Sequence, residues 1–260
     1  MNSKPLFSII TVSKNAELLI SRTLHSLNAQ TYRNFEHVII DGASEDNTKS
    51  IVENLRRNNT LFLSEQDEGI YYAMNKGLNI AKGVYFSFLN AGDTYDIKML
   101  EMVSKIISSN LDLDLICADA RVIGVNGKIR IEKSDPEAIK KHMIPHLGIF
   151  IRNKFDRTQS FDTRFRIAAD YHFLLSEIAH GGTLRRIPKP LATFYDGGFS
   201  NTPENRIRSI LETQALRRQF GYIGREKEFI IILYLIVATI LKGPYRMKMI
   251  TFIFRFLAKR

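Results

Sequence analysis

The chain has 260 residues, of which 45% are apolar and 25% are charged, and its formal net charge is +10 at pH 7. This composition fits one globular domain, alone or with an appendage, and excludes intrinsic disorder, collagen and a coiled coil. The single cysteine, Cys117, excludes a disulfide framework and a thiolate metal cluster, and it fits a reducing compartment. The first eight residues contain no long apolar run, so we expect no signal peptide.

Strand and helix signals alternate over the first hundred residues. Short β-branched and apolar runs predict strands at residues 6–12, 37–40, 61–63 and 84–89. Apolar residues at helical spacing predict a helix after each strand, and these positions are Ile20, Leu24 and Leu27; Ile51, Val52 and Leu55; Ile70, Met74, Leu78 and Ala81; and Leu100, Val103 and Ile107. This alternation predicts βαβ units with a parallel sheet, and therefore an α/β protein.

The second half of the sequence is less regular. Residues 113–117 predict another strand, and Asn126-Gly127 predicts a hairpin, so we expect the sheet to acquire antiparallel strands. Residues 162–178 predict a loop followed by a helix. Prolines and glycines at 188–198 predict irregular chain, and Thr202-Pro203 predicts the start of another helix.

The basic excess is concentrated at the carboxyl end. Residues 201–260 contain 12 Lys and Arg against 4 Asp and Glu, which indicates an anionic partner such as a membrane surface or nucleic acid. Residues 229–241 read FIIILYLIVATIL and would reach about 20 Å as a helix, which is too short to span a bilayer comfortably. Such a segment suits a helix in the membrane interface, and the alternatives are packing against the preceding domain and a dimer interface. We predict a domain at 1–220 and a basic, apolar helical tail at 221–260, attached to a membrane through 229–260.

Two acidic residues follow predicted strands at the sheet edge where ligands of such proteins bind. Asp41 ends the strand at 37–40; it is a candidate acceptor of a hydrogen bond from a nucleobase or ribose, or else the organiser of its own loop. Asp93 ends residues 88–93, which read FLNAGD. A divalent cation bound to a diphosphate needs only one or two protein carboxylates, so Asp93 is a candidate ligand; the alternative is a cap of the next helix.

Asp170 is the third acidic candidate. Small and apolar neighbours surround it in the sequence, so its carboxylate is expected to be partly desolvated. Desolvation raises the pKa of a carboxylate and improves it as a general base. The alternatives are a helix cap and a salt bridge to Arg164 or Arg166.

Taken together, these segments resemble the inverting glycosyltransferases of family 2, which have the GT-A fold. The similarity is greatest to the branch that acts in bacterial exopolysaccharide, O-antigen and colanic acid assembly. It is carried by the order and spacing of residues 7–12, 38–48, 65–77, 88–93, 145–146, 162–170 and 194–200. The resemblance implies an α/β fold with a mostly parallel, Rossmann-like sheet flanked by helices and, beyond it, the helical tail.

The resemblance also implies how the donor would be bound. Thr11 and Asp41 would bind the uridine part of a UDP-sugar, and Asp67 and Asn75 would line the donor pocket. Asn90 begins a segment that stands where relatives carry an Asp-x-Asp motif, and it would also contact the donor.

For the chemistry, the resemblance implies three further roles. Asp93 would hold Mn²⁺ or Mg²⁺ against the diphosphate, because the departing nucleotide develops negative charge. Asp170 would be the general base that deprotonates the acceptor hydroxyl, so that direct displacement inverts the anomeric centre. His146 would line the acceptor or diphosphate side. The expected acceptor is a saccharide on a polyprenyl diphosphate, at the inner face of a bacterial cytoplasmic membrane.

Several features limit or compete with this interpretation. Asn90 and Gly92 replace residues that are often acidic, and Tyr72 stands where many relatives carry Asp. A non-catalytic partner subunit with a degenerate site is therefore an alternative, although Asp93 and Asp170 argue against it. A nucleotide-sugar pyrophosphorylase would need a glycine-rich loop at residues 13–16, which contain no glycine. A nucleic-acid partner is disfavoured because the basic tail alternates with aliphatic runs rather than stacking aromatics.

Overall fold

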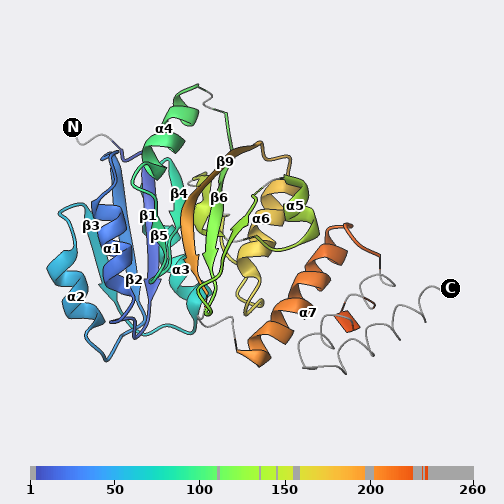
Figure 1. Ribbon diagram of the computed structural model, residues 1–260, viewed down its shortest axis with the longest axis horizontal. Coiled ribbons are helices and arrows are strands. Elements are labelled where there is room, and N and C mark those ends of the chain that lie inside the picture. Colours follow the sequence, from blue (N-terminus) through green and yellow to red (C-terminus); the bar gives the residue numbers. More distant parts are fainter. Residues whose placement is uncertain are drawn as a thin grey trace.

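Four parallel strands form one half of the sheet in this computed structural model. They are β1 (Phe7–Ser13), β2 (Phe35–Asp41), β3 (Thr60–Ser64) and β4 (Tyr85–Phe88), in the spatial order β3-β2-β1-β4. The helices α1 (Ile20–Asn28), α2 (Thr48–Leu55) and α3 (Ile70–Ile80) make the crossovers between them (Figure 1). The predicted βαβ units are thus confirmed. The structure describes residues 4–109, 112–134, 136–144, 146–154, 159–196, 202–224, 230 and 232–233.

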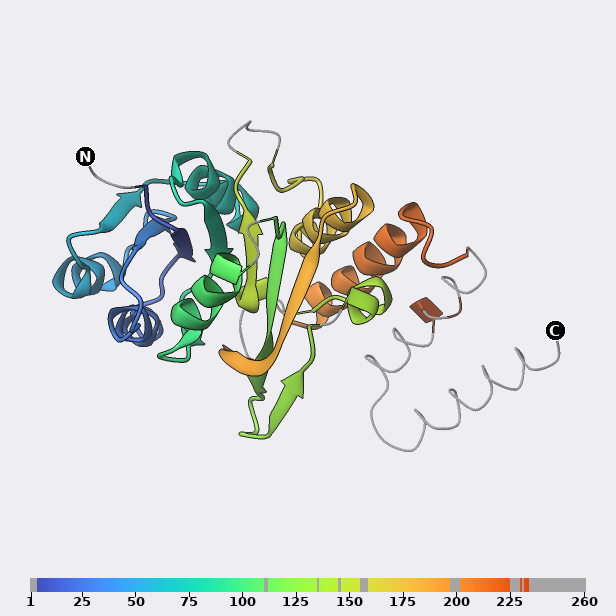
Figure 2. The same ribbon diagram turned by 90° about the horizontal axis from the view of Figure 1, so that it is seen from above.

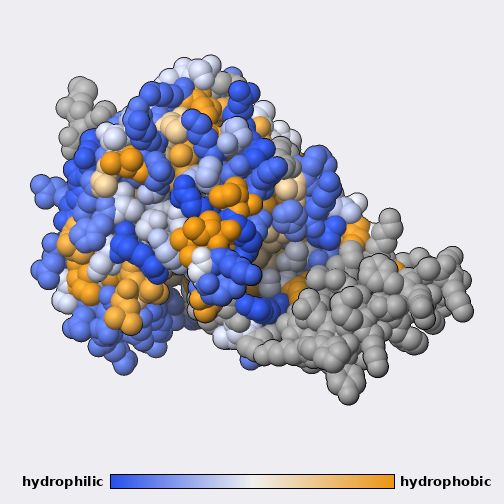
Figure 3. Space-filling model, in the orientation of Figure 1, coloured by the Kyte–Doolittle hydropathy of each residue, from blue (hydrophilic) through white to orange (hydrophobic). Residues whose placement is uncertain are grey.

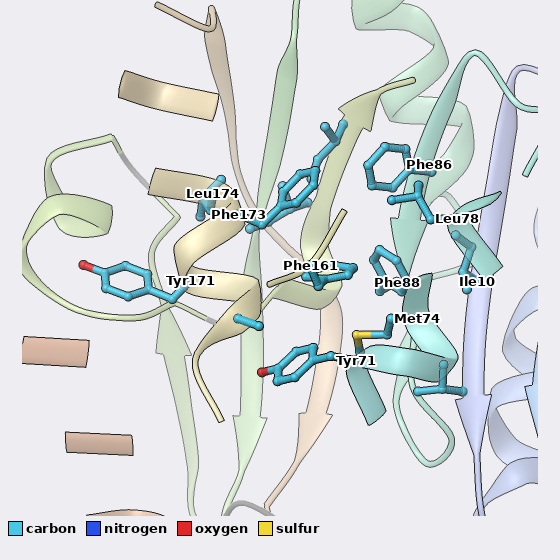
Figure 4. Packing of buried hydrophobic residues seen from close by; sticks show 14 of the residues in the cluster. Ile10, Tyr71, Met74, Leu78, Phe86, Phe88, Phe161, Tyr171, Phe173 and Leu174 are labelled. Atoms are coloured by element: carbon cyan, nitrogen blue, oxygen red, sulfur yellow. The ribbon is translucent and has the colours of Figure 1, made fainter. Parts of the chain in front are cut away.

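Helices cover both faces of this sheet because neighbouring strand residues point in opposite directions. Ile10 packs in a core with α3 and α6 (Ala169–Ala179), whereas Ile9 packs with α4 (Met99–Ser109). α3 lies unusually close to β1, since a Cβ at Gly77 would come within 2.5 Å of the Ile10 side chain. Figure 4 shows the first of these cores, in which aromatic rings from strand, helix and loop meet.

The other half of the sheet is mixed. The strand β8 (Ile149–Arg152) runs antiparallel between β4 and β6 (Leu115–Ile123), and β7 (Ile129–Glu132) pairs with β6 as a hairpin. The strand β9 (Leu184–Tyr195) is parallel to β6, and β5 (Thr94–Tyr95) is antiparallel to β9. The expected antiparallel strands and the Asn126-Gly127 hairpin are confirmed. The short helix α5 (Pro136–Lys141), the 3₁₀ turn η1 (His146–Gly148) and α7 (Pro203–Gln219) complete the described elements, and Figure 2 shows α6 and α7 side by side.

The prediction of irregular chain at 188–198 was wrong for most of that segment. Residues up to Tyr195 belong to β9 even though the strand contains Pro188 and Pro190. The pairing of β9 with β6 shifts in register on both sides of Asp119, and both prolines fall in this irregular stretch. Proline cannot donate to a strand ladder, and a bulge is a place where that donor is not needed.

Most of the predicted tail at residues 221–260 lies outside the described residues, and so does most of the predicted membrane segment at residues 229–260. Among the residues that are described, no helix has both the length and the apolar character needed to cross a membrane. On the face seen in Figure 3, hydrophobic residues lie in separate groups among hydrophilic ones, which is ordinary for a protein surface. The division into residues 1–220 and 221–260 therefore stays a prediction.

Candidate active site

An open cleft of about 870 Å³ lies where β1 ends and α3 begins. Asp67, predicted to line the donor pocket, is part of its wall. Asp67 also sits against the loop after β2, since a Cβ at Gly42 would come within 2.7 Å of Asp67 Oδ2. The opposite wall comes from the loop before α6 and from α7. Cationic and aromatic side chains on the cleft lining are Lys14, Tyr71, Tyr72, Arg164, Phe165, Arg166 and Arg208.

A row of hydrogen bonds joins three of the predicted site residues. Asp170 Oδ2 lies 2.9 Å from His146 Nδ1, and His146 Nε2 lies 3.2 Å from Asn90 Nδ2. The other carboxylate oxygen of Asp170 lies 3.1 Å from the hydroxyl of Tyr71, which lines the cleft. The Asp170 side chain keeps 12% of its surface exposed. The predicted base is therefore hydrogen-bonded at both oxygens. Tyr71 lines the open cleft, whereas Asp170 and His146 line a separate cavity of about 20 Å³.

Two carboxylates influence the pKa of His146. Burial alone would lower its pKa, but the hydrogen bond and charge of Asp170, together with the charge of Asp93, raise the pKa above its usual value. Asp93 and Asp170 therefore both influence the pKa of the same imidazole.

Asp93 is buried, with 5% of its surface exposed. Its Oδ1 accepts a hydrogen bond from the Tyr195 N–H at 3.2 Å. Burial raises the pKa of Asp93 to about 7, while the Tyr195 N–H and the charges of His146 and Arg22 act in the opposite direction. A carboxylate in this position is stabilised in its ionised form by a nearby cation.

The turn at residues 90–93 fits a divalent cation. The Oδ1 atom of Asn90 is buried and accepts no hydrogen bond from the described residues. Together with Asp93 it supplies oxygen ligands of the type that Mg²⁺ and Mn²⁺ prefer. The described residues hold no group of three or more His, Cys, Asp or Glu that would bind a metal by themselves. Phosphate and water would therefore have to complete the shell, as they do for cations bound with a nucleotide.

The turn itself is held from α1. The hydroxyl of Thr23 donates to the carbonyl of Asp93 at 2.8 Å and accepts from the Gly92 N–H at 2.9 Å. Gly92 has φ +104°, a conformation that favours glycine. The alternative role of Asp93 as a helix cap is not supported, because β5 lies between Asp93 and α4.

Thr11 and Asp41 lie beneath the cleft and not on its surface. Both are fully buried. Thr11 Oγ1 donates to the carbonyl of Leu89 at 2.7 Å and lies 2.8 Å from Nε2 of His37, whose pKa burial lowers to about 3. Asp41 accepts hydrogen bonds from the hydroxyls of Ser13, Ser44 and Ser64 and from the Ser44 N–H. The structure thus gives Asp41 the loop-organising role, and the predicted nucleoside contacts of these two side chains remain untested.

Asn75 also has its amide engaged inside the protein. Its Nδ2 donates to the Phe161 carbonyl at 2.9 Å, and its Oδ1 accepts from the Phe161 N–H at 2.7 Å. The Phe161 ring packs between Tyr71 and Phe88, with centroid distances of 5.7 Å and 5.0 Å (Figure 4). Asn75 therefore supports the wall behind Tyr71 and does not itself line the cleft.

Two alternatives for Asp170 can now be compared with the structure. Arg164 pairs with Asp162 at 2.6 Å rather than with Asp170. Asp170 lies in the first turn of α6, where its Oδ1 accepts from the Tyr171 N–H at 2.9 Å, so it does contribute to the start of that helix. The remaining oxygen is the one that meets His146.

Sequence reasoning missed Glu212, which fixes the start of α6 from α7. Its carboxylate accepts from the amide N–H groups of Arg166, Ile167 and Ala168 at 3.1, 2.9 and 3.0 Å. A carboxylate at a helix amino terminus satisfies unpaired amides and interacts favourably with the helix dipole. Only the tertiary contact between α7 and α6 reveals this role, since nothing in the local sequence around Glu212 signals it.

Comparison with known proteins agrees with this geometry. The sequence model described as "Glycosyl transferase family 2" matches residues 8–175. The chain therefore belongs to glycosyltransferase family 2, and its fold is the GT-A fold.

The individual proteins that are similar to this chain have low sequence identity to it. A "PGL/p-HBAD biosynthesis glycosyltransferase" of Mycobacterium bovis is 29% identical over 205 residues, which cover 76% of this chain and 80% of the relative. The fold is similar to that of S. aureus TarS in complex with UDP-GlcNAc (TM-score 0.66, 18% identity, 90% of this chain and 81% of that one). It is equally similar to the mannosyltransferase PcManGT of Pyrobaculum calidifontis in complex with GDP-Man and Mn²⁺ (TM-score 0.66, 18% identity, 99% and 76%).

Proposed function

We propose that the chain transfers a sugar from a UDP-sugar to a hydroxyl of a lipid-linked saccharide, with inversion, in cell-surface polysaccharide biosynthesis. The observation that carries the proposal is the row Asp170–His146–Asn90, which ends beside Asp93. The row supports the proposal because it links the predicted base to Asn90, which belongs to the same turn as the predicted cation ligand Asp93. Complexes of structural neighbours with UDP-GlcNAc and with GDP-Man and Mn²⁺ support a nucleotide-sugar donor and a divalent cation.

In this mechanism the chain provides binding, orientation and proton transfer. Asn90 and Asp93 would hold the cation, which would neutralise the charge that develops on the departing diphosphate. Asp170 takes the proton of the acceptor hydroxyl as the new glycosidic bond forms and the bond to the diphosphate breaks. Tyr71 and His146 fix the orientation of its carboxylate, so that little reorganisation is needed in the transition state.

The donor is testable without knowledge of the acceptor. We expect the purified chain with Mn²⁺ to hydrolyse one UDP-sugar slowly, releasing UDP, because water can replace an absent acceptor. The assay measures nucleotide release from UDP-glucose, UDP-galactose, their N-acetyl forms and GDP-mannose. Release from GDP-mannose alone would contradict the UDP assignment, and release from none, with no binding of UDP or GDP, would contradict the proposed function.

Membrane attachment through residues 229–260 forms a separate part of the proposal. The apolar run at 229–241 is flanked by Lys and Arg, so it combines hydrophobic insertion with attraction to anionic headgroups. We expect the protein to remain with membranes in high salt and to be released by detergent. Release by salt alone would contradict apolar insertion, and a chain ending at residue 224 serves as the control that should stay in the supernatant.

A further inference from the structure

Arg22 is a cationic side chain beside the turn at residues 90–93. It lies in the first turn of α1, and its guanidinium carbon is 4.0 Å from the centre of the Tyr195 ring, a distance typical of a cation–π contact. The backbone N–H of Tyr195 is the group that donates to Asp93. The residue that supports Arg22 thus also holds the candidate metal ligand.

The guanidinium of Arg22 has no hydrogen-bond acceptor among the residues that the structure describes. Its Nε is buried without a partner, and no oxygen of the described residues accepts a hydrogen bond from its other nitrogens. Its charge is close enough to influence Asp93, yet the two side chains form no ion pair. Buried donors in native proteins are normally satisfied, so the unpaired Nε indicates an acceptor that arrives with a ligand.

The backbone of the turn passes directly beside this guanidinium. A Cβ at Gly92 would lie 3.3 Å from Arg22 Nη2, so glycine allows the close approach. The neighbouring Asn90 Oδ1 is also buried and unpaired. The turn therefore carries an unpaired acceptor, and the unpaired donor of α1 belongs to a guanidinium that lies beside it. A diphosphate bound with a divalent cation would satisfy both atoms. Its oxygens accept hydrogen bonds from arginine, and the cation that they bind would also be ligated by Asn90 Oδ1.

We propose that Arg22 is a diphosphate-binding residue that donates hydrogen bonds to a phosphate oxygen of the nucleotide donor. The inference rests on the proposed function, because it requires a nucleotide at this turn. Arginine suits the role, since its planar, permanently charged guanidinium matches phosphate geometry. Stacking on Tyr195 holds the group in place before the ligand binds, which lowers the entropic cost of binding.

The test compares the affinity of three variants for UDP and for uridine, with Mn²⁺ present throughout. The variants are Arg22→Gln, Arg22→Lys and, as a matched control, Arg33→Gln. Arg33 is an exposed arginine beyond the end of α1 that donates to the Asn28 carbonyl. We expect Arg22→Gln to weaken UDP binding roughly ten- to hundredfold, the usual effect of losing a charged hydrogen bond. Uridine binding should not change, Arg22→Lys should recover part of the affinity, and Arg33→Gln should resemble the wild type.

Calorimetry measures UDP binding, ligand-observed NMR measures uridine binding, and thermal unfolding checks that each variant is folded. Equal UDP affinity in Arg22→Gln and the wild type would overturn this inference and leave the proposed function intact. Equal loss of uridine and UDP would also overturn it, because the effect would then lie in the pocket and not at the phosphate. A wild-type chain that binds neither UDP nor GDP would overturn both the inference and the proposed function. If GDP binds and UDP does not, the same comparison is made with GDP and guanosine.

Discussion

Replacing Asp170 by Asn should reduce the rate of sugar transfer by about 10²- to 10⁴-fold while leaving UDP affinity nearly unchanged. That range is the usual contribution of a positioned general base. The amide keeps the shape of the side chain and can still accept from Tyr71 and from the Tyr171 N–H. It cannot take up the proton of an acceptor hydroxyl. The measurements are kcat with acceptor saturating and Kd for UDP by calorimetry.

Two further variants make this result specific. Asp114→Asn is the same substitution at the start of β6, where the side chain accepts from the backbone and hydroxyl of Thr183, and it should retain full activity. His146→Gln should lose less activity than Asp170→Asn if the carboxylate is the base and the imidazole only orients it. The base assignment would be wrong if Asp170→Asn lost transfer and UDP binding in parallel, or if only His146→Gln were inactive.

The structure also shows which parts of the fold could be predicted from sequence. The strands and helices of the first hundred residues have strong local periodicity, so the βαβ half was predictable. β9 was not, because Pro188 and Pro190 are strand breakers in isolation, and only the bulged pairing with β6 explains how they are accommodated. The two-residue strand β5 is too short to leave a periodic signal.

The candidate site was predictable in its residue types but not in its connections. Asp93 and Asp170 could be singled out because each stands at the end or start of a predicted element. Their partners lie far along the chain, since Tyr71 is 99 residues from Asp170, and the Tyr195 N–H is 102 residues from Asp93. The role of Asp41 could not be decided from its position in the sequence. Its position after a strand left both a ligand contact and a loop-organising role open, and only the resemblance implied the ligand contact. In the structure, three serine hydroxyls, one of them from β3, donate to its two oxygens.

Replacing Asp93 by Ala should abolish the part of UDP affinity that depends on Mn²⁺. Among the side chains of residues 90–93, those of Asn90 and Asp93 carry oxygen atoms, so losing the carboxylate leaves a single neutral side-chain ligand. We expect UDP binding with Mn²⁺ to weaken roughly ten- to hundredfold, as for the loss of one charged partner worth about 1.5–3 kcal/mol. Binding with EDTA present should be the same in the variant and the wild type. Calorimetric titrations of both proteins with UDP, in Mn²⁺ and in EDTA, provide the comparison.

The control for this experiment is Asp96→Asn. Asp96 lies three residues further along and accepts from the Lys98 N–H at the start of α4, so its charge is not part of the turn. Asp93→Asn adds a second check, because the amide keeps an acceptor for the Tyr195 N–H while removing the negative charge. A loss in Asp93→Asn as large as that in Asp93→Ala assigns the effect to charge at the cation. An undiminished gain from Mn²⁺ in Asp93→Ala would instead mean that the metal binds elsewhere, and the role of this turn as the cation site would have to be abandoned.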